Sequence, residues 1–231
     1  MAKKKKSLNT NNLMVVLLVI TAVVVCGALG FNIYSILNAD TGQGTTNTVQ
    51  KVSNEYSNDY YTIGNNPTDI NKACFKEINA ALKEEDGVKI AEAVAKTFVT
   101  EYYTWTNKDG NYDIGGIQYI YAPKQSDFET YTLDSFYEDL DLYLTQVDRA
   151  DLIEVKDVTV NSSTEGKYGV QADGQTDADG NPVLTELSSV SVDVSWTYQS
   201  SGALSTDSFQ SHAVIHVVDN QGRWEIAGIE G

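Results

Sequence analysis

Residues 190–198 have the sequence Val-Ser-Val-Asp-Val-Ser-Trp-Thr-Tyr, in which apolar and polar side chains alternate without interruption. Successive side chains of a β-strand point to opposite faces of the sheet, so this pattern predicts a strand with one buried and one solvated face. A single solvated face is typical of antiparallel sheets, because parallel sheets are usually covered on both sides. The stretch therefore predicts an antiparallel sheet packed by one face on a core.

The period of two continues on both sides of this stretch. An earlier strand is predicted over 153–160, with a bulge near Lys156-Asp157 because the alternation changes phase there. Later strands are predicted over 212–218 and 223–229, each preceded by a turn rich in Ser, Gly, Asn or Asp. The second half of the chain is therefore expected to form a meander of four antiparallel strands.

Upstream of these strands, apolar residues recur every three or four positions, which indicates amphipathic helices. The first helix is predicted to begin with Asn66 as its cap and Pro67 as its first residue, and to end at Gly87. The second carries one apolar stripe from Ala91 to Trp105. Both stripes are expected to face the same core as the sheet.

A third helix and a short strand complete the pattern. Ile117–Tyr121 is predicted to be extended, and the capping-box pair Ser126 and Glu129 is predicted to open a helix whose stripe reaches Val147. The expected fold class is α+β: three helices packed on one face of a curved antiparallel sheet of about four to five strands.

The N-terminal region predicts a membrane anchor. From Leu13 to Phe31 the only polar side chains are Thr21 and Cys26, and 19 residues in a helix span about 28 Å, close to the hydrocarbon core of a bilayer. Four lysines precede this run and no acid occurs before Asp40, so the positive-inside bias places the N-terminus in the cytoplasm. A cleaved signal peptide would have a shorter apolar core and a cleavage site directly after it, so an uncleaved anchor is expected.

The chain is therefore expected to have four parts and an extracellular C-terminal domain. After the anchor, a segment rich in Asn, Thr, Ser and Gly is typical of a flexible stalk. The parts are residues 1–12 (basic cytoplasmic tail), 13–37 (transmembrane anchor), 38–66 (stalk) and 67–231 (extracellular α+β domain). Ala22, Cys26 and Gly30 form a small-residue stripe that would let two anchors pack closely.

The charge balance limits the partners of the outer part. The chain has 16 Lys and Arg against 32 Asp and Glu, and four of the bases precede the anchor, which leaves 12 bases and 32 acids after it. A net charge of −20 repels phosphate backbones, so nucleic acid is not an expected partner. The expected partners are the membrane, through Leu13–Phe31, and other copies of the chain or envelope proteins. Cys74 is the single cysteine beyond the anchor, so no disulfide within the domain is expected.

Few residue patterns indicate chemistry. His212 and His216 share a strand face, but four residues along a strand separate them by about 13 Å, too far to bind one metal ion together. They are interpreted as polar positions on a half-exposed sheet face, or as single residues lining a cavity. Phosphate loops, Cys/His metal clusters and nucleophile elbows are missing from the sequence. No catalytic residue and no cofactor is predicted.

One acidic loop echoes a calcium site. With Gln175 as its first position, Asp177, Asp179 and Glu186 occupy the third, fifth and twelfth positions of an EF-hand loop. The first ligand would be Gln instead of Asp, and Pro182 occupies a usually aliphatic position. A solvated hairpin loop is the alternative, and these three residues remain weak calcium candidates.

The order of elements resembles the cone-shaped α+β fold of the nuclear-transport-factor-like superfamily. The resemblance covers Thr68 to Gly231 and is carried by Ala91–Val99 (AEAVAKTFV), which continues into Tyr102-Tyr103-Thr104-Trp105, and by the closing strand Trp224–Ile229 (WEIAGI). The whole plan of basic tail, anchor, stalk and outer domain is similar to the VirB-type bitopic subunits of type IV secretion systems and their Gram-positive conjugation counterparts.

The resemblance implies a non-enzymatic assembly or scaffold subunit of a cell-surface or conjugative secretion complex. Enzymes of the same superfamily use a buried Asp or His beside tyrosines, and this chain has 14 tyrosines. The alternative is therefore an extracellular small-ligand-binding domain, or an enzyme that uses the cavity of the cone.

Overall fold

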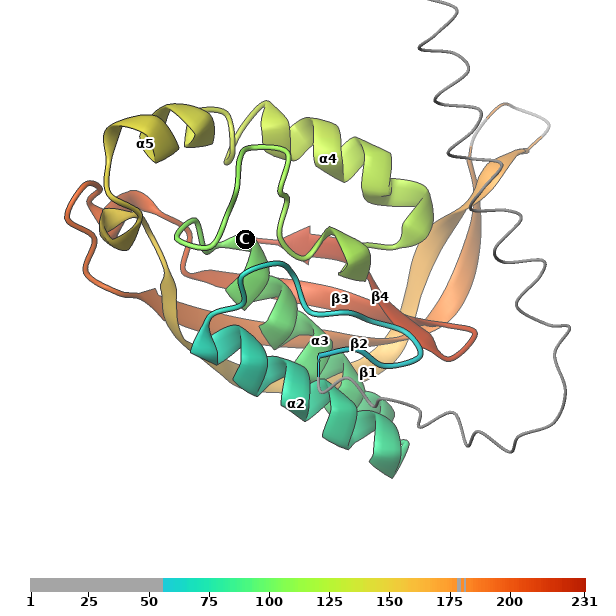
Figure 1. Cartoon of the computed structure of the whole chain (residues 1–231). Helices are drawn as coiled ribbons and strands as arrows, with labels where there is room; N and C mark the ends of the chain where they lie inside the picture. Colours follow the sequence, from blue (N-terminus) through green and yellow to red (C-terminus); the bar gives the residue numbers. More distant parts are fainter. Residues whose placement is uncertain (1–55, 178–179, 181) are drawn as a thin grey trace, which may run out of the picture. The chain divides into compact units, whose positions relative to one another are not determined.

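The structure is a computed structural model that describes residues 56–177, 180 and 182–231 (Figure 1). The predicted tail, the Leu13–Phe31 anchor and most of the predicted stalk lie outside the described residues. Within the described ranges, no helix combines the length and apolarity needed to cross a bilayer.

The described residues form an α+β fold, which confirms the expected class. Four α-helices and four strands are described, and the strands form one antiparallel sheet in the order β1-β2-β3-β4. The predicted meander is therefore confirmed. The elements are α2 (Asp69–Glu84), α3 (Gly87–Tyr102), α4 (Gln125–Leu133), α5 (Leu140–Gln146), β1 (Val155–Thr176), β2 (Pro182–Tyr198), β3 (His212–Asn220) and β4 (Arg223–Glu230).

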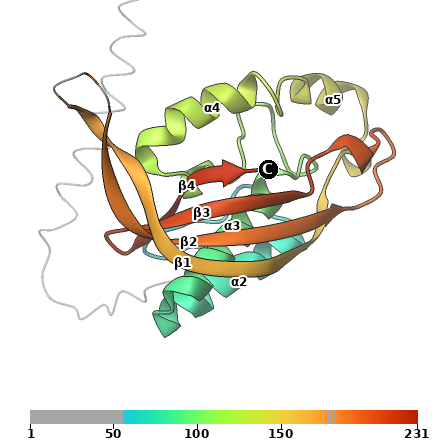
Figure 2. The same cartoon turned by 180° about the vertical axis from the view of Figure 1, so that it is seen from behind.

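Strand β2 has the predicted two faces. Val190, Val192, Val194 and Trp196 are at most 3% exposed, whereas the polar residues between them are half-buried. The helices cover the apolar face, and Figure 2 shows the opposite face without a helix in front of it. The alternation in the sequence therefore identified the core face of the sheet.

Strand β1 is longer than predicted. The bulge near Lys156-Asp157 is confirmed by a register shift between Val155 and Asp157, but the strand continues well past Val160 to Thr176. Residues 161–169 have no apolar alternation and thus gave no strand signal. They are held in the strand by backbone hydrogen bonds to β2.

Helix α3 lies on the sheet, and α2 packs against α3 (Figure 1). Eleven of the 16 residues of α3 are buried, including Ala91, Val94 and Phe98 of the predicted stripe. A helix that contacts a sheet on one side and a helix on the other buries more than one stripe. Figure 1 shows α4 and α5 along another side of the sheet, away from α2.

The boundaries of the first two helices differ from the prediction. Thr68, not Asn66, caps α2: its side chain accepts from Asn71 N–H, and the Asn71 side chain accepts from Thr68 N–H. Helix α2 begins at Asp69, so Pro67 is not the first helical residue, and Asn66 has a left-handed φ of 49°. Gly87 does not end α2 but begins α3, directly after the cap Asp86.

Helix α3 ends at Tyr102, three residues before the predicted Trp105. The Trp105 N–H leaves the helical pattern and donates to Ile153 O at 2.8 Å, next to the start of the sheet. Trp105 is nevertheless buried. The apolar spacing therefore indicated its burial correctly and its secondary structure wrongly.

The predicted third helix is two helices. Residues 134–139 form turns between α4 and α5, and buried Tyr137 there donates its hydroxyl to Tyr102 O at 2.9 Å. Helix α4 begins at Gln125 without a side-chain cap, so the predicted capping box at Ser126 is wrong. Ile117–Tyr119 is a 3₁₀-helix instead of a strand, followed by a single parallel bridge between Ile120 and Ile226.

Candidate functional site

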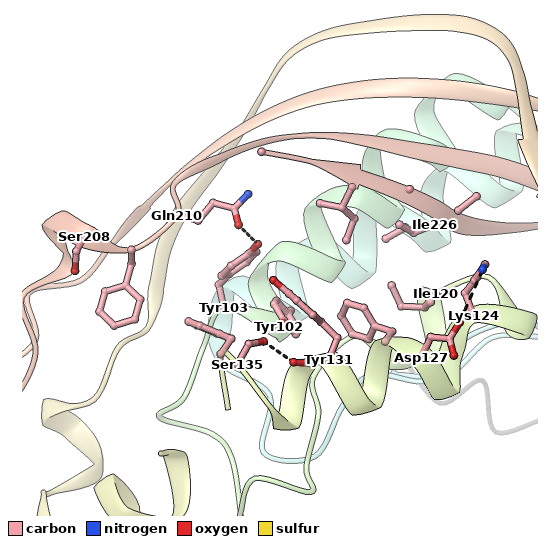
Figure 3. A pocket seen from close by; sticks show the side chains of 17 residues that line it. Tyr102, Tyr103, Ile120, Lys124, Asp127, Tyr131, Ser135, Ser208, Gln210 and Ile226 are labelled. Carbon is pink, nitrogen blue, oxygen red and sulfur yellow. Dashed lines mark hydrogen bonds and ion pairs between the residues drawn. The ribbon is translucent and has the colours of Figure 1, made fainter. Parts of the chain in front are cut away.

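A cleft of about 760 Å³ lies between helix α4 and strand β4 (Figure 3). The side chains of α4 form one wall and residues 226–229 of β4 form the other. Residues 208–210, from the loop that leads into β3, close one end of the cleft. The cleft is open to solvent and is large enough for a segment of several residues.

Aromatic side chains form the inner surface of this cleft. Tyr102 stacks on Phe98 with 5.3 Å between ring centroids and contacts Phe128 at 5.2 Å and Phe136 at 5.3 Å. Phe136 also contacts Phe209 at 6.1 Å, which joins the α4 side of the cleft to the loop before β3. Such a surface favours apolar side chains of a ligand.

A few polar groups are held among these rings. Tyr103 donates its hydroxyl to Gln210 Oε1 at 2.7 Å (Figure 3). Gln210 Nε2 in turn donates to His212 O at 2.9 Å. Burial raises the pKa of Tyr102 to about 12 and raises that of Tyr103 still further. Both phenols are therefore neutral at physiological pH and serve as hydrogen-bonding groups.

The rim of the cleft is charged. Lys124 Nζ lies 3.8 Å from Asp127 Oδ2, and the side chain of Asp127 is almost fully exposed. Between Gln125 and Asp148, along α4 and α5, the sequence has seven acids and no base, and all seven acids are exposed. This side of the domain therefore has a negative field.

The wall formed by β4 is the outer edge of the sheet. The backbone N–H and C=O of Trp224 both bond to the Tyr61 hydroxyl, at 3.0 and 2.7 Å. Ile226 O accepts from Tyr121 N–H at 2.8 Å. Beyond Ile226, no described residue makes a backbone bond to this edge, where it borders the cleft.

Both histidines lie away from the cleft lining. His212 is exposed, with Nε2 at 2.9 Å from Asp193 Oδ1, and hydrogen bonds from Asn161 and His212 lower the pKa of Asp193. His216 is half-buried: Nδ1 lies 2.9 Å from Ser191 Oγ, and its ring stacks on Tyr168. They therefore lie on a half-exposed sheet face, as one of the two interpretations held.

The calcium candidates lie on the β1–β2 hairpin. Glu186 is in β2 opposite Gly169, and its carboxylate lies 3.6 Å from Lys167 Nζ. Asp177 is exposed near the turn, and Asp179 lies outside the described residues. In the part of the chain that the structure describes, no group of three His, Cys, Asp or Glu side chains is placed to hold a metal ion.

A buried polar cluster at the end of α3 was missed by the sequence analysis. Glu101 is 3% exposed and accepts from Gly64 N–H at 3.4 Å, Gly116 N–H at 3.2 Å and the Tyr119 hydroxyl at 3.5 Å. Lys108 is also buried and donates to Asn107 Oδ1 at 2.9 Å. Glu101 lies three and seven positions after Phe98 and Val94, so its place on the apolar stripe was the available signal.

Burial moves the pKa values of both charged groups toward neutrality. It raises the pKa of Glu101 to about 7, although the nearby Lys108 opposes the shift. It lowers the pKa of Lys108 to about 8, against the attraction of Glu101. Because Glu101 bonds to Gly64, Gly116 and Tyr119, this cluster joins α3 to the N-terminal segment and to the loop before α4.

Comparisons with family models, with curated proteins and with solved structures give no match to this chain. The cleft combines aromatic rings, neutral phenols and an unpaired strand edge, which are groups that bind a ligand. The buried acid Glu101 and the buried base Lys108 lie outside its lining.

Proposed function

We propose that this protein is a membrane-anchored, non-enzymatic docking domain that receives a partner polypeptide outside the membrane. In this proposal it is an assembly or scaffold subunit of a cell-envelope complex, such as a conjugative secretion apparatus. The observation that carries the proposal is the open cleft between α4 and the free edge of β4. A strand edge beside a helix is a common docking place for extended polypeptides.

Two features of the sequence support the membrane-bound part of the proposal. The apolar run Leu13–Phe31 follows Lys3–Lys6, an order that favours a cytoplasmic N-terminus and an outer domain. The succession of helices and antiparallel strands is compatible with a nuclear-transport-factor-like cone, the fold proposed here for residues 67–231. Short tail, anchor and outer cone together resemble the bitopic subunits of type IV secretion systems.

Photo-crosslinking in the native host tests the docking function. A photoreactive amino acid at Tyr131, 66% exposed on the α4 wall, should give discrete adducts with one or a few envelope proteins. The matched control is position Tyr112, which is 74% exposed and lies outside the cleft lining. Identical adducts from the two positions, or none from Tyr131, would overturn the proposed function.

Protease added to intact cells tests the placement. Digestion should remove the domain while the tail and anchor remain with the membrane. A domain that stays intact on whole cells and is cut after lysis would contradict the extracellular placement. A full-length protein that stays soluble without detergent would contradict the anchor.

The second candidate function is small-ligand binding or catalysis in the same cleft. It is favoured by the volume of the cleft and by the three side chains Tyr103, Tyr131 and Asp127 that line it. This candidate would be favoured by a metabolite mixture from the host that raises the melting temperature of the full chain but does not reduce crosslinking from Tyr131. A metabolite mixture that reduces crosslinking to a polypeptide partner would favour the docking function.

A further inference from the structure

We propose, as a refinement that rests on the docking function, that the partner contributes a basic extended segment that pairs with the outer edge of β4. This segment would become the fifth strand of the sheet. The occupant is a foreign polypeptide and not another part or copy of this chain. Three observations carry the proposal. They are the pattern of backbone hydrogen bonds along β4, the α4 wall across the cleft, and the charge around the cleft.

Along the outer edge of β4, the first backbone groups have hydrogen-bond partners and the later ones do not. The Tyr61 hydroxyl bonds to Trp224 N–H and C=O, and Tyr121 N–H bonds to Ile226 O. Ile120 thus occupies the fifth-strand position for one parallel bridge with Ile226, and the chain then turns into the 3₁₀-helix Ala122–Lys124, which contains Pro123. Residues 227–230 continue the edge beside the cleft, where no described residue bonds to it.

An incoming strand has room there because α4 stands across the cleft from β4 instead of packing on it (Figure 3). A strand lies about 4.8 Å from its neighbour in the sheet and points alternate side chains to opposite faces. Every second side chain of the incoming strand would therefore face the rings of Phe128 and Phe136 on the helix side. The segment is expected to alternate apolar residues with others.

The charge around the cleft determines which residues should alternate with the apolar residues of the incoming strand. The cleft lining has one base and one acid, Lys124 and Asp127. Six further exposed acids and no base lie between Phe128 and Asp148, and the chain beyond the anchor has a net charge of −20. A second copy would bring the same charge and be repelled. The segment 38–55 of this chain has the acids Asp40 and Glu55 and the single base Lys51, so it does not supply a basic strand. A lysine- or arginine-rich partner segment is complementary.

Labelled peptides test this proposal on the full chain in detergent micelles. The probe is a nine-residue peptide of alternating Lys and Val, and its control replaces each Lys with Glu. The Lys peptide should bind at least about tenfold more tightly, and its affinity should fall as salt is added. Equal binding of the two peptides would overturn the basic character of the partner.

Backbone methylation tests strand addition without changing the protein. One version of the Lys peptide has methyl groups on the Val backbone nitrogens, and a second has them on the Lys backbone nitrogens. These two sets of N–H groups point to opposite edges of an extended strand, so only one version should lose binding. Equal loss or equal retention of binding would overturn the strand-addition mode.

Cleft variants complete the test. Tyr131→Ala should weaken binding of the Lys peptide, whereas Tyr112→Ala, outside the cleft lining, should leave it unchanged. If both variants bind like the unmodified chain, the peptide binds elsewhere and the inference fails. If crosslinking from Tyr131 finds a partner but methylation shows no difference between the two versions, strand addition fails while the docking function stands. If crosslinking finds no partner, the docking function itself fails.

Discussion

At the scale of single residues, the Tyr61 hydroxyl joins the N-terminal segment to the sheet through two hydrogen bonds with the backbone of Trp224. Tyr61→Phe leaves this half-buried N–H and C=O without their partner, so the free energy of unfolding should fall by about 1–3 kcal/mol. Urea denaturation of the full chain in micelles measures the change. The neighbouring Tyr60→Phe is the control, and an equal loss in both variants would contradict the assignment.

Glu101 makes a pH-dependent contribution. Burial raises its pKa from 4.5 to about 7 in the folded state. Between these values the folded chain retains a proton that the unfolded chain has released, so stability falls as pH rises through this window. For Lys108 burial lowers the pKa from 10.5 to about 8, so stability rises as pH rises between 8 and 10.5. The two pKa shifts together therefore predict that the free energy of unfolding is lowest near pH 7–8.

Glu101→Gln should remove the fall in stability between pH 4.5 and 7. The rise at higher pH should remain but begin below pH 8, because the Glu101 carboxylate no longer holds up the pKa of Lys108. Urea midpoints measured across the pH range give both slopes. The control is Glu129→Gln, an exposed carboxyl on α4. If the downward slope survives in Glu101→Gln, another group produces it.

At the scale of elements, the junction between α2 and α3 depends on a close approach. A Cβ at Gly87 would lie 2.7 Å from the Trp224 ring of β4. Gly87→Ala should therefore lower the free energy of unfolding by about 1–3 kcal/mol, because the ring or the helix has to move. Gly166→Ala on β1 is the matched control, since its Cβ would meet only Ser189 Oγ at 4.0 Å. An unchanged free energy of unfolding in Gly87→Ala would show that the junction accommodates the extra methyl group.

At the scale of the whole molecule, calcium should act only through ionic screening. Glu186 pairs with Lys167 and lies about 13 Å along β2 from Pro182, the first residue of that strand. The melting temperature in excess calcium should therefore equal that in equal magnesium. A rise specific to calcium would identify the hairpin as a binding site.

Local pattern determined much of this protein. The alternation over 190–198 identified the buried face of β2, and the phase change near Lys156-Asp157 located the bulge in β1. The stripe of α3 named residues that are buried even where the helix had already ended, as at Trp105. These features could be predicted because the spacing of apolar residues reports directly on which side chains face a core.

The tertiary structure alone decided the rest. Residues 161–169, which have no apolar alternation, become strand through pairing with β2. Tyr137 lies where the predicted third helix is interrupted, and it packs on Tyr102. The cleft exists because α4 stands opposite a strand edge about a hundred residues later in the chain. Such features depend on which distant segments meet, and their free energy comes from contacts that no local spacing encodes.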